Sequence, residues 1–352
     1  MANIQRQFEQ FHETIKLKRF GENEILREKR DIIRKKLKDR LPDVFAAHGE
    51  ACPTFRFRDQ GSYEMDTGVK PLNDDYDIDQ GLYFAVGTDA YPDPVVLKRR
   101  VREALTGHTK DVRIRRSCVT IFYQREGEPI YHVDVAVYAD GSHEADGKAR
   151  LAKGRESSET EHRIWEISNP QALTEKIEGR FAGNDRAQFR RVVRSLKRWS
   201  DKSFPKDGNA APLGIGLTVA AYYDLQCAYT DVIAGKPDDL RALRDLVRAI
   251  LGRFVITGFD WSTLRPIRRL SVKLPVEPYT DLFARMSDKQ MVEFEDKLKR
   301  LRDALDAASS VVDPVEACQE LQKVFGKDFP VPAPEDTARR HAPAIVSSSS
   351  SA

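Results

Sequence analysis

Two aspartates in this sequence are spaced so that they can act together on a metal ion. Asp77 and Asp79 are separated by a single residue in YDIDQGLYF, a segment whose β-branched and aromatic content is typical of a strand. Side chains at positions i and i+2 of a strand lie on the same face. We therefore expect the two carboxylates to point together, and Ile78 to point to the opposite, buried side.

A third aspartate lies in another strand pattern, IYHVDVAVYA, about 55 residues further along. Asp134 interrupts an apolar strand here, and the valines at 133, 135 and 137 occupy the opposite face. An acidic side chain in such a strand is costly unless it has a partner or a metal ion. His132 shares the face of Asp134, and we expect it to be a structural residue rather than a ligand.

The three carboxylates together predict a metal-dependent reaction on phosphates. Mg²⁺ is held by oxygen ligands, and aspartates on neighbouring strands can hold two ions about 4 Å apart that activate a hydroxyl and stabilise a leaving pyrophosphate. Gly61 and Ser62 form a turn ahead of them, where a glycine lets the backbone approach a phosphate and the serine adds a hydroxyl. Each motif alone is common; the ordered set is much more specific.

The surrounding patterns predict a half with helices and strands followed by a helical half. A helix is expected over residues 3–40, ending at Leu41-Pro42, then a strand near 55–57, a helix over 94–107, and strands in VRIRRSCVTIFY and IYHVDVAVYA. Residues 140–163 are polar and expected to be mobile. Beyond them, NDRAQFRRVVRSLKRWSDK predicts a helix with an apolar face and with its basic residues mostly elsewhere, namely Arg191, Arg194, Arg198 and Lys202. Three further helices follow.

Composition limits the function. The chain has 352 residues and a net charge of only +3, which argues against obligate binding of duplex nucleic acid. Its four cysteines include no closely spaced pair, so neither a zinc module nor a disulfide framework is expected. No segment predicts a signal peptide or a membrane helix, and we expect a cytoplasmic protein without a membrane partner.

The set of motifs resembles the DNA polymerase β superfamily of nucleotidyltransferases. The segments TFRFRDQGSYEMDTGVKPLNDDYDIDQGLYF, IYHVDVAVYA, FRRVVRSLKRW and LQKVFGKDFPVP resemble the bacterial cGAS/DncV-like nucleotidyltransferases, and their motifs are most like those of DncV. The resemblance implies an α+β, bilobed fold: a mixed β-sheet lobe with a long N-terminal spine helix, and a helical C-terminal lobe. With the patterns above, we expect a catalytic core at 1–164 and a helical lobe at 165–332, and the Pro-, Ala- and Ser-rich tail at 333–352 is expected to be disordered.

The resemblance also implies an activity. Members of the family join nucleoside triphosphates such as ATP and GTP into cyclic second messengers that activate an effector in anti-phage (CBASS) defence. By this match, Asp77, Asp79 and Asp134 would be catalytic and bind Mg²⁺, with Mn²⁺ as the alternative ion. The nucleotide would be bound by residues of both lobes, namely Gln60, Gly61, Ser62 and Lys197.

Some positions depart from the family pattern or leave alternatives open. PLGIG has glycine where DncV has a phosphate-binding serine, and a DncV arginine is replaced near Thr120, with Arg113 and Arg115 either substituting for it or forming a solvated edge. The base choice of DncV therefore does not carry over. The tail ending at Ala352 would suit conjugation by an ubiquitin-transfer-like enzyme, or is simply disordered. A linear, template-independent RNA nucleotidyltransferase and a catalytically silent nucleotide-binding protein remain as alternatives.

Overall fold

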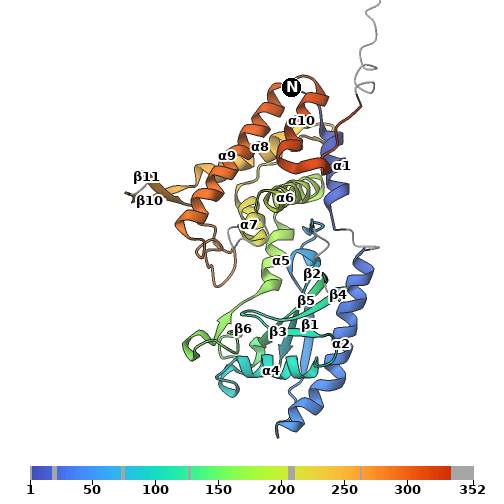
Figure 1. The fold of residues 1–352 in the computed structure, drawn as a ribbon, viewed down its shortest axis with the longest axis vertical. Coiled ribbons are helices and arrows are strands. Elements are labelled where there is room, and N and C mark those ends of the chain that lie inside the picture. The colour runs from blue at the N-terminus through green and yellow to red at the C-terminus, as the bar shows by residue number, and fades with distance from the viewer. Residues whose placement is uncertain are drawn as a thin grey trace, which may run out of the picture.

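Two lobes make up the chain, one built on a β-sheet and one on helices (Figure 1). The computed structural model describes residues 2–17, 22–72, 76–125, 128–204, 211–261 and 264–333. The predicted α+β, bilobed fold class is confirmed. The tail from 334 to 352 lies outside the described residues, and the division at residue 164 stays a prediction.

The sheet lobe contains a seven-stranded mixed sheet. Its strands are β1 (Phe55–Asp59), β2 (Tyr76–Phe84), β3 (Asp111–Ile114), β4 (Val119–Arg125), β5 (Glu128–Ala139), β6 (Arg150–Lys153) and β7 (Ile164–Ile167). The order is β1-β2-β5-β4-β3, and β6 pairs with both β5 and β7. The central β2–β5 pair is parallel and the other pairs are antiparallel.

Helices cover the apolar face of this sheet. The helices α2 (Glu22–Ala47) and α4 (Val95–Ala104) contribute Leu37, Phe45 and Leu97 to a buried cluster with the apolar side chains of β2 and β5. The other face of β2 and β5 carries the three aspartates. The short helix α3 (Gly61–Glu64) lies between β1 and β2, and the 3₁₀ turns η1 (Thr88–Ala90), η2 (Gly141–His143) and η3 (Thr160–His162) lie in the connections.

The helical lobe packs around one large apolar core. Its helices are α1 (Gln5–Ile15), α5 (Pro170–Gly179), α6 (Gly183–Ser203), α7 (Gly214–Asp224), α8 (Asp239–Gly252), α9 (Asp288–Ser310), α10 (Pro314–Phe325) and the turn η4 (Gly326–Asp328). Phe11 of α1 lies 5.0 Å, between ring centroids, from both Phe325 and Phe329. The first helix is thereby tied to the last described segment of the chain.

The N-terminal spine consists of two helices rather than one. The expected continuous helix over 3–40 is wrong, because α1 ends at Ile15 and Lys16 adopts an extended backbone. The helix α1 packs in the helical lobe, whereas α2 packs on the sheet lobe (Figure 1). The predicted end at Pro42 is also wrong. Leu41 and Phe45 lie four residues apart and are both fully buried, so their burial continues the helix through an exposed proline.

Two further expectations are corrected. Residues 140–163 were expected to be polar and mobile, but they include β6, which pairs with β5 and β7. The second half is not wholly helical, because it contains the hairpins β8 (Tyr229–Asp231) with β9 (Lys236–Pro237), and β10 (Val255–Asp260) with β11 (Arg265–Arg269). In the described part of the chain, no helix is long and apolar enough to span a membrane.

Candidate active site

The pairing of β2 with β5 brings the three aspartates together. In this parallel pair Asp79 is opposite Asp134, and Asp77 is opposite His132. The predicted alternation is confirmed, since Ile78 is almost fully buried on the reverse face while Asp77 is exposed. Two adjacent strands therefore present a row of acidic groups on one face of the sheet.

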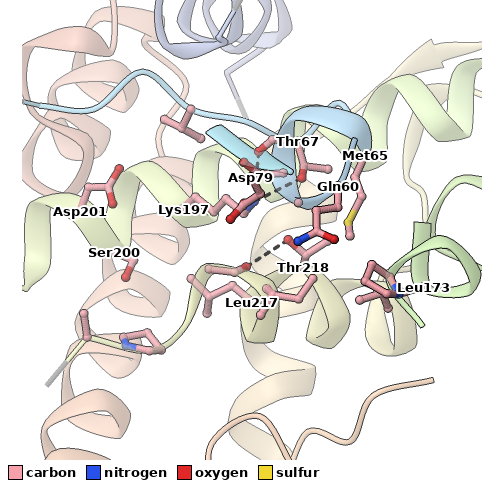
Figure 2. Close-up of a pocket in the computed structure, with 18 of the residues that line it drawn as sticks. Gln60, Met65, Thr67, Asp79, Leu173, Lys197, Ser200, Asp201, Leu217 and Thr218 are labelled. Atoms are coloured by element: carbon pink, nitrogen blue, oxygen red, sulfur yellow. Dashed lines mark hydrogen bonds between the residues drawn. The ribbon is translucent and has the colours of Figure 1, made fainter. Parts of the chain in front are cut away.

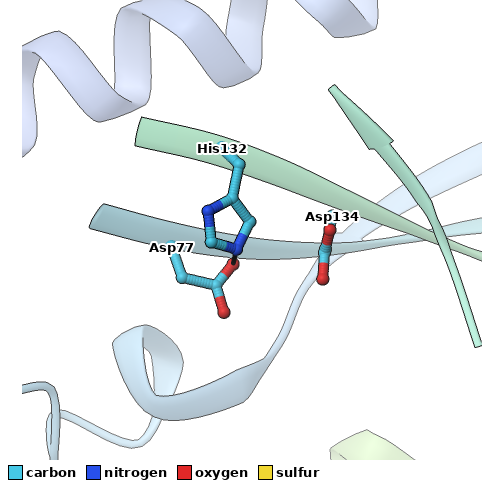
Figure 3. Close-up of side chains that lie close together, drawn as sticks. All are labelled: Asp77, His132 and Asp134. Atoms are coloured by element: carbon cyan, nitrogen blue, oxygen red, sulfur yellow. Dashed lines mark ion pairs between the residues drawn. The ribbon is translucent and has the colours of Figure 1, made fainter. Parts of the chain in front are cut away.

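Asp77, His132 and Asp134 form a group that can hold a metal ion (Figure 3). One ligand atom from each lies within 4.8 Å of those of the other two, and His132 Nε2 is 3.3 Å from Asp77 Oδ1. We expected His132 to be structural, but it lies among the ligand candidates. Carboxylate oxygens suit Mg²⁺ and Mn²⁺, and an imidazole nitrogen is also a metal ligand.

The electrostatics of Asp79 fit a bound cation. Burial first, and then the carboxylates of Asp77 and Asp134, raise the pKa of Asp79 well above its usual value, while His132 and Lys197 act in the opposite direction. Three carboxylates so close together repel one another when ionised. A divalent cation at this place would relieve that repulsion, so the residues present fit the metal that the family implies.

Gly61 brings the backbone of α3 against the aspartates. Its φ is +79°, which is favourable for glycine and strained for other residues. A Cβ atom at this position would collide with Asp79 Oδ2. The glycine is therefore required twice, for its backbone conformation and for the close approach.

Lys197 reaches the same place from the helical lobe (Figure 2). It lies on α6, and its Nζ donates hydrogen bonds to the Thr67 backbone oxygen at 3.1 Å and to Thr67 Oγ1 at 3.2 Å. Burial first, and then the positive charge of Arg194, lower the pKa of Lys197 to about 8. Its ammonium group still carries most of its charge at pH 7.

Arg194 links α6 by hydrogen bonds to the segment that follows α3. Its Nε donates to the Gly68 backbone oxygen at 2.9 Å, and its Nη2 donates to the Asp66 backbone oxygen at 2.8 Å and to Asp66 Oδ1 at 2.6 Å. Arg190 also contacts Asp66, at 3.0 Å. Arg194 and Arg198 were expected mostly off the buried face of this helix, and that prediction is wrong: each is 3% exposed. They are buried because α6 is covered by residues 66–68 and by η4 as well as by the apolar core.

A cavity of about 600 Å³ opens between the lobes at these residues. Its volume is in the range of pockets that bind small molecules and cofactors. Five of the seven predicted site residues line it: Gln60, Gly61, Ser62, Asp79 and Lys197. The other two lie next to Asp79: Asp77 is two residues before it on β2, and Asp134 is opposite it on β5. The remaining lining is mainly apolar and includes Met65, Val69, Leu173, Phe204, Pro212, Ile215 and Leu217.

Positions that depart from the family pattern lie around the same site. Gly214, from PLGIG, lines the cavity. Arg113 and Arg115 lie over the ring of Phe122, at 5.1 and 5.0 Å from its centroid. Thr120 is buried, and its hydroxyl donates to Asp134 Oδ1 at 2.5 Å.

Sequence reasoning missed three contributors to this site: Thr67, Arg194 and the contact of Thr120 with Asp134. The strand pattern placed Thr120 in a strand next to that of Asp134, but the register between the strands was needed to make them neighbours. For Arg194, the one signal was its position one helical turn before Lys197.

Comparison with known proteins agrees with this geometry. Residues 55–138, which contain Gly61, Ser62 and all three aspartates, match the family model of the cyclic GMP-AMP synthase DncV-like nucleotidyltransferase domain. The fold and site thus define a nucleotidyltransferase. The segment belongs to the DncV-like domain family, and the predicted resemblance to bacterial cGAS/DncV-like nucleotidyltransferases is confirmed.

Solved structures show that the similarity in fold extends over nearly the whole chain. The GTP-bound form of Vibrio cholerae DncV is 19% identical with a TM-score of 0.69, covering 93% of this chain and 96% of that one. E. coli CdnC with ATP is 19% identical, with a TM-score of 0.62 and coverages of 93% and 98%. Bradyrhizobium diazoefficiens CdnG with GTP is 15% identical, with a TM-score of 0.66 and coverages of 92% and 96%.

Proposed function

We propose that this protein is a cyclic oligonucleotide synthase of anti-phage (CBASS) defence that joins purine nucleoside triphosphates, ATP, GTP or both, with release of pyrophosphate. The observation that carries the proposal is the meeting of the aspartate face of β2 and β5, the Gly61-Ser62 turn and Lys197 at one cavity between the lobes. The similarity in fold to the V. cholerae cyclic AMP-GMP synthase, over 94% of this chain and 98% of that one, supports it.

The residues divide the work between the two lobes. Gln60, Gly61 and Ser62 would bind the donor triphosphate from the sheet lobe, and Lys197 would bind its phosphates from the helical lobe. Asp77, Asp79 and Asp134 would hold Mg²⁺, with Mn²⁺ as the alternative and His132 as a further ligand or as a partner of Asp77. When bound, a divalent cation neutralises charge on the phosphates and makes a hydroxyl more acidic.

Each turnover would require the same substitution more than once. The ribose hydroxyl of the acceptor nucleotide forms a bond to the α-phosphorus of the donor, and the bond between that phosphorus and the bridging oxygen breaks. Pyrophosphate leaves with the bridging oxygen, and the hydroxyl proton passes to the Asp134 carboxylate and then to water. A second substitution within the linear product closes the ring; V. cholerae DncV has been solved with a linear intermediate of this kind.

The test is product formation by the purified full-length protein. We expect ATP, GTP or their mixture, with Mg²⁺ or Mn²⁺, to give a phosphatase-resistant product whose mass and bases are read by mass spectrometry. Asp134→Asn, which keeps the size of the side chain, should abolish it. Asp146→Asn is the matched control, because Asp146 contacts Arg150 on the same lobe and does not line the cavity.

Each alternative predicts a different product. A linear nucleotidyltransferase would give a product that phosphatase degrades from its triphosphate end. A silent nucleotide-binding protein would bind a nonhydrolysable triphosphate in calorimetry without releasing pyrophosphate. Full activity in Asp134→Asn would overturn the assignment of the aspartates.

Two partners follow from the proposed role. The cyclic product would activate a downstream effector in the cytoplasm, where nucleoside triphosphates are available. An ubiquitin-transfer-like enzyme would act on the carboxyl group of Ala352. Loss of higher-mass conjugates after deletion of Ala352, with synthesis unchanged, would support this second role.

A further inference from the structure

Strand β4 places a buried hydroxyl directly beside the aspartate face. Thr120 is opposite Asp134 in the β4–β5 register, on the side away from Asp79. The row across the sheet therefore runs Asp79, Asp134, Thr120. Cross-strand neighbours of this kind lie about 5 Å apart and contact one another through their side chains.

The hydrogen bond between these residues has a defined direction. A carboxylate only accepts, so the Thr120 hydroxyl donates its hydrogen to Asp134 Oδ1 at 2.5 Å. Cys118 Sγ also lies within hydrogen-bond distance of Thr120 Oγ1, at 3.5 Å.

The burial of Thr120 makes this contact obligatory. Its side chain is fully buried, and an unpaired hydroxyl there would cost free energy. Asp134 Oδ1 accepts this hydrogen bond at the shorter distance, and the contact holds the Thr120 hydroxyl toward the aspartate face. The contact uses one of the two carboxylate oxygens of Asp134, Oδ1.

We propose that Thr120 is a positioning residue that orients the Asp134 carboxylate for metal binding and for accepting the hydroxyl proton. The inference rests on the proposed function, because Thr120 acts only by supporting the roles proposed there for Asp134. Hydrogen bonds to a metal-binding carboxylate hold it in its binding orientation, and their loss typically lowers metal affinity or activity by about 10–100-fold. Thr120 does not touch the substrate in this role.

Two substitutions separate the hydroxyl from the shape of the side chain. Thr120→Val has the same shape without the hydroxyl, and Thr120→Ser keeps the hydroxyl without the methyl group. Three quantities are measured on the full chain: Mn²⁺ binding without nucleotide, by electron paramagnetic resonance of free Mn²⁺; kcat and KM for pyrophosphate release; and the thermal unfolding midpoint.

For Thr120→Val we expect Mn²⁺ affinity and kcat to fall about 10–100-fold, with KM for the nucleotide and the unfolding midpoint close to wild type. Thr120→Ser should retain both Mn²⁺ binding and kcat. Wild-type Mn²⁺ affinity and kcat in Thr120→Val would overturn the inference. So would an equal loss in both variants with a lowered unfolding midpoint, or a change confined to KM.

The same measurements distinguish this inference from the proposed function. If wild type binds Mn²⁺ but releases no pyrophosphate, the proposed function fails, and the Mn²⁺ affinities of the two variants still decide the role of Thr120. If wild type releases pyrophosphate and Thr120→Val does so equally well, the function stands and the inference on Thr120 fails.

Discussion

The charge of Lys197 should control how the affinity for a nucleoside triphosphate depends on pH. Burial lowers the pKa of this lysine to about 8, because its ammonium group lies inside the cavity against Thr67 and near Arg194. A lysine with that pKa is about 90% protonated at pH 7 and about 10% protonated at pH 9. The folded protein therefore loses this charge over a range where an exposed lysine keeps it.

Lys197→Met removes the charge and keeps most of the length of the side chain. A hydrogen bond to a charged group contributes about 1.5–3 kcal/mol, so the wild type should bind a triphosphate roughly 10–150 times more tightly than the variant at pH 7. Between pH 7 and pH 9 the protonated fraction of Lys197 falls about ninefold to tenfold. The ratio of the two affinities should therefore shrink by up to about tenfold, or about 1.4 kcal/mol.

Isothermal titration calorimetry with nonhydrolysable ATP and GTP analogues at fixed Mg²⁺ measures this ratio. Titration of the triphosphate and of other groups affects both proteins, so it cancels in the comparison. Lys110→Met, at an exposed lysine of the sheet lobe, controls for loss of general positive charge. A ratio that stays constant from pH 7 to pH 9, or equal affinities at pH 7, would refute this account of Lys197.

Three other substitutions test the site and the fold. Gly61→Ala should abolish product formation in a protein that still folds, because the added Cβ collides with Asp79 and φ is +79°; activity assays and circular dichroism check this. Asp79→Asn should raise the unfolding midpoint of the metal-free protein at pH 7, since burial and two carboxylates disfavour the charged form; the difference should shrink as the pH falls and Asp79 becomes protonated. Phe11→Ala should cost about 3–5 kcal/mol of unfolding free energy in urea denaturation, because a fully buried ring that packs against both Phe325 and Phe329 is lost.

The period of two along β2 and β5 was enough to predict the aspartate face. Ile78 and the valines around Asp134 are buried on one side of the sheet, as the alternation required. Sequence alone could not show that β2 and β5 are adjacent and parallel, or that Asp79 is opposite Asp134. Register depends on the whole sheet, so the contacts of His132 with Asp77 and of Thr120 with Asp134 were not predictable in detail.

Helix ends and buried charges were predicted less well. The sequence offers Pro42 as a stop, but the burial of Leu41 and Phe45 continues α2 beyond it. Arg194 lies on the charged side of an amphipathic pattern, and tertiary contacts with Asp66 and Gly68 bury it nonetheless. Local patterns describe one face of a helix, whereas α6 is covered on several faces because it lies between the two lobes.

The position of α6 explains how residues far apart in sequence could act on one triphosphate in the proposed reaction. Arg194 and Lys197 lie one turn apart on this helix, and both donate to the segment 66–68 that follows Gly61 and Ser62. Four hydrogen bonds from these two side chains, at 2.6–3.1 Å, reach backbone oxygens and one carboxylate of the sheet lobe. They therefore hold Lys197 close to the Gly61-Ser62 turn, the two groups proposed to bind the phosphates. Phosphoryl and nucleotidyl transfer depend chiefly on positioning and on stabilisation of charge. In the proposed reaction, α6 would set the position of Lys197 relative to the sheet lobe, and the contacts of Thr120 with Asp134 and of Gly61 with Asp79 would set the orientation of the aspartates.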